Sequence, residues 1–185
     1  MSYARFAAMV LISTIVMYGL MYLNTYALDH IFFSQTRAWM ALVMGATMAV
    51  LMVGFMWGMY KNIAANIAIV VASILVFAGA LWLVRSQETV GDVSYMEAMI
   101  PHHSIAIMTS ERAHIRDPEV RKLADGIIDA QVREIAEMKR LIARLESTPV
   151  AKNAPDLPSY RNRGVPPPPP ETDQSTGIDT LSIDR

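Results

Sequence analysis

Residues 63–84 read IAANIAIVVASILVFAGALWLV, and no charged side chain interrupts them. A helix of about 20 apolar residues is long enough to cross a bilayer, so this stretch predicts a membrane span. Two earlier stretches have the same character, and with them residues 1–86 form a three-helix membrane domain. The predicted spans are about residues 6–28, 38–60 and 63–84.

Charged residues are scarce in the first half of the chain. Although 18% of the 185 residues are charged, residues 1–84 contain only Arg5, Asp29, Arg37 and Lys61. A soluble domain does not leave so long a segment nearly uncharged, so a lipid bilayer is the expected partner. The positive charges are almost balanced between the two sides and slightly favour a cytoplasmic N-terminus. We therefore expect a bacterial inner-membrane protein whose C-terminal part is periplasmic.

The composition also excludes several classes of function. The chain contains no cysteine, which excludes disulfides, thiolate zinc sites, iron–sulfur clusters and thiol nucleophiles. With a net charge of −1 and no basic run, a nucleic-acid partner is not expected. No activated nucleophile or acid–base pair stands out, so we do not expect an enzyme.

Two helices are predicted after the membrane domain. Ser94 and Glu97 have the spacing of a capping box and predict a helix over about residues 95–114. Asp117 followed by Pro118 is typical of a second helix start, with Asp at the N-cap and Pro at the first helical position. Because the connection is short, the two helices should form an antiparallel hairpin.

The predicted hairpin domain spans residues 93–146, and from residue 147 onward the chain loses its helical periodicity. Eight of the ten prolines fall in residues 147–185, including the run from Pro166 to Pro170. Such a composition predicts a disordered, proline-rich tail. The expected fold class is therefore all-α: three transmembrane helices, a helical hairpin and a disordered tail.

The first helix of the hairpin carries a stripe of possible metal ligands. Met96, Met99 and His103 lie within about 60° of each other on an ideal helix, whereas His102 points about 100° away from His103. Pro101 should kink the helix beside both histidines. Pairing the two helices across the turn places Met96 opposite Met138, Met99 opposite Glu134 and Ile135, and His103 opposite Gln131.

This arrangement predicts a Cu(I) site. Thioether and imidazole ligands select Cu(I) over harder ions, so Met96, Met99, His103 and Met138 are the candidate ligands, with His102 and Met108 as further contributors. Gln131 or Glu134 would orient the imidazole of His103 as hydrogen-bond partners outside the ligand set. Methionine is also a common packing residue in helical cores, so a structural role for the stripe stays open.

Another metal assignment has less support. Glu111 and His114 have the i, i+3 spacing seen in di-iron helices. A di-iron bundle needs several inward carboxylates, and the hairpin offers only Glu111 and Glu134.

The segment Tyr95-Met-Glu-Ala-Met-Ile-Pro-His-His-Ser-Ile-Ala-Ile-Met108 resembles a motif of a bacterial ferritin-like family. The motif is Met-x-x-Met-Ile-x-His-His-x-x-Ala, and the family is the domain of unknown function numbered three hundred and five, which includes periplasmic copper-binding proteins of the CopM type. The run Gln131-x-x-Glu134-Ile135-x-x-Met138 continues the likeness. The resemblance implies a ferritin-like helical domain associated with copper. By position it carries over the ligand candidates Met96, Met99, His102, His103, Met108 and Met138.

The second predicted span has a methionine stripe of its own: Met40, Met44, Met48, Met52 and Met56 recur at every fourth position. A Cu(I) relay across the bilayer is one hypothesis. Packing between helices is the favoured alternative, because Gly54-x-x-x-Gly58 is a small-residue contact motif.

Two functions remain open at this stage. The first is a membrane-anchored protein that binds Cu(I) for copper buffering, tolerance or delivery. The alternative is a non-metal, membrane-anchored module for helical oligomerisation or interaction. A two-helix hairpin of this size buries little surface alone, so two hairpins should pair in a homo-oligomer, or one should pack on the membrane helices.

Overall fold

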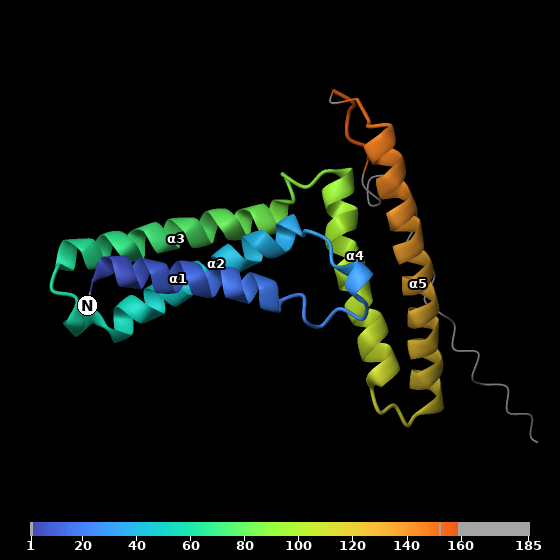
Figure 1. Ribbon diagram of the computed structural model, residues 1–185, viewed down its shortest axis with the longest axis horizontal. Helices are drawn as coiled ribbons and strands as arrows, with labels where there is room; N and C mark the ends of the chain where they lie inside the picture. Colours follow the sequence, from blue (N-terminus) through green and yellow to red (C-terminus); the bar gives the residue numbers. More distant parts are fainter. Residues whose placement is uncertain (1, 152, 159–185) are drawn as a thin grey trace, which may run out of the picture. The chain divides into compact units, whose positions relative to one another are not determined.

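The computed structural model describes residues 2–151 and 153–158, and all regular structure in these ranges is helical. The prediction of an all-α fold with three apolar helices at the N-terminus is confirmed (Figure 1). The α-helices are α1 (Tyr3–Leu20), α2 (Gln35–Phe55), α3 (Ile63–Ser86), α4 (Asp92–Arg112) and α5 (Pro118–Ser147), with short 3-10 helices at Leu28–His30 and Trp57–Met59.

Helices α1, α2 and α3 are each long and apolar enough to cross a membrane, which indicates membrane association. Each begins at a polar N-cap side chain that accepts a hydrogen bond from the first turn. Ser2 accepts from the Ala4 N–H at 3.2 Å, Ser34 from the Arg37 N–H at 3.2 Å, and Asn62 from the Ala65 N–H at 3.1 Å. These caps supply partners for backbone groups that the helices themselves leave unpaired.

The predicted bounds of the first two spans differ from the observed ones. Helix α1 ends at Leu20 instead of continuing to residue 28, because side chains donate hydrogen bonds to the carbonyl oxygens of Met21 and Tyr22. The guanidinium of Arg37 donates to Met21 O, and Thr25 Oγ1 donates to Tyr22 O at 2.9 Å. Helix α2 begins earlier than predicted, after its Ser34 cap, and ends at Phe55 before Gly58.

Helix α2 contacts both α1 and α3. Its buried residues are mostly small: Ala41, Gly45, Ala46, Ala49 and Val53. The closest approach is at Gly45, where an added Cβ would overlap Thr14 Oγ1 of α1. By contrast, a Cβ built at Gly54 or Gly58 would meet no neighbouring helix within 4 Å among the described residues, so the predicted contact motif is wrong for this fold. A small residue does make the close helix contact, but it is Gly45, which lies nearer the N-terminus of α2 than Gly54.

Replacing Gly45 with alanine should therefore destabilise the membrane domain. Thr14 Oγ1 also donates to Val10 O at 2.8 Å, which holds the side chain in place and prevents it from yielding easily. We expect a loss of about 1–3 kcal/mol, the usual cost of overpacking, measured by thermal unfolding of the chain in detergent. Gly54→Ala is the matched control, since open space surrounds that position. An equal effect of both variants would contradict the close contact at Gly45.

In the hairpin of α4 and α5, the predicted start of α5 is observed, whereas the predicted start of α4 is not. Asp117 Oδ1 accepts from the Glu119 and Val120 N–H groups at 2.9 and 3.0 Å, and Pro118 is the first helical residue. However, α4 starts at Asp92 after an N-cap at Gly91 that makes no side-chain hydrogen bond, so the predicted capping box is wrong. The helix is longer at this end because Val93 packs against the hairpin core.

The core of the hairpin contains six buried residues, and Phe32 from the segment between α1 and α2 packs against it. Within this one chain, the hairpin core is therefore covered in part by a residue that precedes α2. The six are Met96, Ile100, Ile107, Ile135, Met138 and Ile142.

Only part of the predicted tail is described. Helix α5 continues to Ser147, and the described residues beyond it, 148–151 and 153–158, contain no helix or strand. The predicted disorder of residues 159–185 lies outside the described residues.

Candidate functional site

Two of the predicted ligands meet in the hairpin core. Met96 of α4 and Met138 of α5 are 6% and 9% exposed and belong to the same hydrophobic cluster. Met99 is partly buried and packs against that cluster. The structure thus brings together three of the methionines that the sequence predicted as one group.

The imidazole of His103 on α4 lies against the carboxylate of Glu134 on α5. Its Nδ1 lies 3.1 Å from Glu134 Oε2, and its side chain is only 13% exposed. The two atoms are close, but their geometry is not that of a hydrogen bond. Burial lowers the pKa of His103, the Glu134 carboxylate opposes this shift, and His102 adds to it. The neutral imidazole is the form that a metal ion requires.

The observed pairing corrects the predicted register. His103 lies against Glu134, whereas the sequence pairing placed it opposite Gln131. The reason is the turn: α4 already ends at Arg112, and the longer connection to α5 shifts the facing residues by about one helical turn. Glu134 and Met138 are four residues apart, as are Met99 and His103, so each pair shares one face of its helix.

The remaining candidates are more peripheral. His102 is exposed, and its ring centroid lies 6.1 Å from that of His103. Together with Met99 and Arg37 it lines a cavity of about 250 Å³. Met108 and Gln131 are partly buried, and His114 is exposed in the turn after α4. Met108 is not among the hydrophobic residues that form or pack against the cluster around Met96 and Met138.

Sequence reasoning missed a polar junction beside this cluster. Ser104 is fully buried, and its Oγ accepts the Tyr26 N–H at 2.7 Å. The same oxygen lies 3.0 Å from His30 Nδ1, so the serine hydroxyl is placed to donate to the imidazole. Nearby, Lys139 Nζ pairs with Asp29 Oδ2 at 2.6 Å. The α1–α2 loop, residues 21–34, is thereby joined to both helices of the hairpin.

The available signal for this junction was the pair Asp29-His30 between two apolar stretches. Asp29 is the one acidic residue in residues 1–84, and a charge retained there needs a partner. The Lys139 ammonium lowers the pKa of Asp29, while burial lowers the pKa of His30. The sequence gives no indication, however, that the partners would be on α4 and α5.

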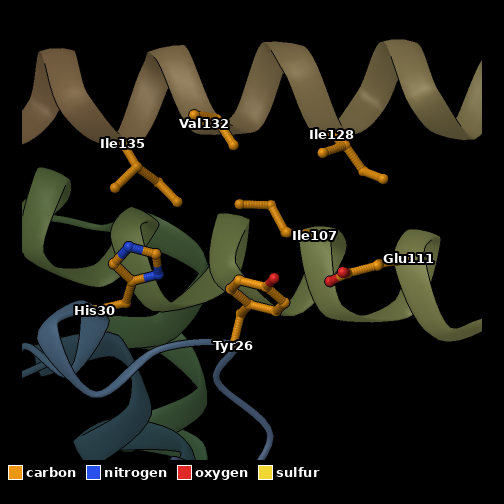
Figure 2. A pocket seen from close by; sticks show the side chains of 7 residues that line it. All are labelled: Tyr26, His30, Ile107, Glu111, Ile128, Val132 and Ile135. Atoms are coloured by element: carbon orange, nitrogen blue, oxygen red, sulfur yellow. The ribbon is translucent and has the colours of Figure 1, made fainter.

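The loop and the hairpin line a second, open cavity of about 260 Å³ (Figure 2). Figure 2 shows Tyr26 and His30 reaching from the loop toward α4, while three aliphatic side chains of α5 approach from the opposite side. A hydrogen bond to Glu111 raises the pKa of Tyr26. The lining residues are Tyr26, His30, Ile107, Glu111, Ile128, Val132 and Ile135.

The donor atoms decide which metal ion the hairpin can accept. In the described part of the chain, no group of three or more His, Asp or Glu side chains is placed to hold a metal ion. This gives no support to a di-iron site or to a site for a hard cation. Met96 and Met138 in the buried cluster, Met99 packed against it and His103 on the same helix as Met96 supply thioether and imidazole groups, the donor types that a soft ion such as Cu(I) prefers.

Comparison with known proteins assigns the class of this chain. Residues 87–177 match the family described as Domain of unknown function (DUF305). The chain is also 33% identical over 102 residues to an uncharacterized protein of Acanthamoeba polyphaga mimivirus, covering 51% of this chain and 67% of that relative. The chain belongs to the DUF305 family. No solved structure matches it, so the ferritin-like fold implied by the resemblance stays a prediction.

Proposed function

We propose that this chain is a membrane-anchored protein that binds Cu(I) through the hairpin of α4 and α5. The observation that carries the proposal is the burial of Met96 and Met138 in one cluster, with Met99 packed against it. His103 completes the donor set through Nε2, since its Nδ1 faces Glu134 Oε2 at 3.1 Å across the hairpin; Glu134 would hold the ring there by a hydrogen bond once the ion is bound. His102, Met108 and Gln131 are peripheral contributors.

The proposed roles are copper buffering, tolerance or delivery, without catalytic turnover. The three apolar helices support the anchor, and the slight charge bias supports a cytoplasmic N-terminus with the hairpin on the periplasmic side of a bacterial inner membrane. A homo-oligomer would bring two such hairpins together and remains part of the proposal.

The second candidate is a non-metal interaction module. It is favoured by the same cluster, because buried methionines also serve as adaptable packing residues. In that case the hairpin would hold its shape without any ion, and copper would leave its stability unchanged.

Thermal unfolding of the whole chain in lipid nanodiscs, with and without Cu(I) under reducing conditions, separates the two candidates. A ligand that binds only the folded form must raise the midpoint, so we expect a higher midpoint with Cu(I) and no change with Mg²⁺. The whole chain is required because Phe32 and Ser104 join the hairpin to the α1–α2 loop. A midpoint indifferent to Cu(I) would refute the copper proposal and favour the interaction module.

A further inference from the structure

The α1–α2 loop exposes large apolar side chains. Leu23, Leu28 and Phe33 are 78%, 86% and 63% exposed, and Ile31 is exposed as well. Soluble loops present polar groups to water, so a run of exposed apolar residues in one short connection indicates a contact that the chain by itself does not supply.

Other residues of this loop already contact the hairpin. Phe32 packs against the hairpin core, the Tyr26 N–H and His30 meet Ser104, and Asp29 pairs with Lys139. The loop therefore packs against α4 and α5 through Phe32 and its polar groups, whereas Leu23, Leu28 and Phe33 stay largely uncovered by the described residues.

The length of α1 indicates what covers these apolar side chains. Its 18 residues span about 27 Å at 1.5 Å per residue, which is less than the roughly 30 Å of a hydrocarbon core. The residues that follow Leu20 must therefore begin within the apolar layer or at its boundary. Both ends of the loop continue into helices that are themselves long enough to cross a membrane.

Three aromatic side chains and one arginine lie together where the loop joins α1 and α2. The rings of Tyr18 and Tyr22 are 5.4 Å apart, those of Tyr18 and Phe33 are 6.2 Å apart, and the Arg37 guanidinium lies 4.4 Å from the centre of the Tyr22 ring. Tyrosine and arginine with this arrangement are typical of the lipid headgroup region, where one end of the side chain is apolar and the other is wet.

We infer that the α1–α2 loop is an interfacial lipid anchor, with Leu23, Leu28 and Phe33 inserted at the headgroup and acyl-chain boundary. Its polar groups then hold the hairpin against the bilayer surface through Ser104 and Lys139. The hairpin is thus a peripheral membrane element rather than a domain tethered only by the connection between α3 and α4. This inference rests on the membrane anchor of the proposed function and is independent of copper.

The test uses nitroxide labels, which the absence of cysteine makes direct. Leu23→Cys, Leu28→Cys and Phe33→Cys each provide one labelling site in the whole chain and replace a side chain that is at least 63% exposed. In phosphatidylcholine nanodiscs holding one chain each, we expect these labels to be relaxed several-fold more by oxygen than by a water-soluble nickel chelate. Leu75→Cys, on the exposed side of α3, reports the apolar layer, and Lys122→Cys, exposed on α5, reports water.

Three results would contradict a loop inserted at the lipid boundary. Labels on the loop that match Lys122 while Leu75 stays inaccessible to nickel would overturn the inference and leave the membrane anchor intact. Labels on the loop that neither reagent reaches would show a protein cover and also overturn it. A Leu75 label open to nickel would refute the membrane anchor, and the inference with it.

Discussion

Replacing Met96 and Met99 together with leucine should weaken Cu(I) binding by at least about a hundredfold, because even residues that only orient a ligand cost about 10- to 100-fold. Both side chains belong to or pack against the buried cluster that contains Met138. Leucine conserves the apolar volume nearly enough to keep the hairpin folded, so the variant removes sulfur without removing packing. A competition titration against a Cu(I) chelator, with the whole chain in detergent, measures the change.

Two matched controls sharpen this experiment. Met44→Leu/Met48→Leu removes two thioethers from α2 and should leave the affinity unchanged if those methionines only pack between helices. His114→Ala, which alters an exposed histidine, should likewise have no effect, whereas His103→Ala should weaken binding. A folded Met96→Leu/Met99→Leu chain with undiminished affinity would assign these methionines to the core and refute the site.

Replacing Ser104 with alanine should cost about 1–3 kcal/mol of stability, the penalty for a buried donor left without a partner. The hydroxyl is fully buried, accepts the Tyr26 N–H and lies beside His30 Nδ1, so both groups lose their partner at once. We expect a lower thermal midpoint and faster proteolysis within the α1–α2 loop, because the loop loses its attachment to α4.

Ser110→Ala is the control for this variant. Ser110 is on the same helix and only partly buried, so its loss should stay within about 0.5 kcal/mol, as for most surface changes. If Ser104→Ala and Ser110→Ala proved equally mild, the loop would not depend on the Ser104 junction, and the hairpin would be held by its aliphatic core alone.

The candidate site was predictable in part, because its ligands lie close together in sequence. Met96, Met99 and His103 share one helix face, and helical periodicity alone groups them. The partner of His103 was not predictable to the residue. It depends on where α4 ends and how many residues form the turn, and sequence signals place such boundaries only to within a few residues.

The sequence by itself determined the three apolar helices, the start of α5 at Asp117-Pro118 and the methionine–histidine stripe, because these depend on local composition, capping and periodicity. Only the tertiary structure decided that Gly45 rather than Gly54 makes the close helix contact, since that depends on the partner residue Thr14. The same holds for the junction of Tyr26 and His30 with Ser104, whose members are more than seventy residues apart in the chain. Contacts between distant segments arise from packing and the pairing of buried polar groups, which no local pattern in the sequence records.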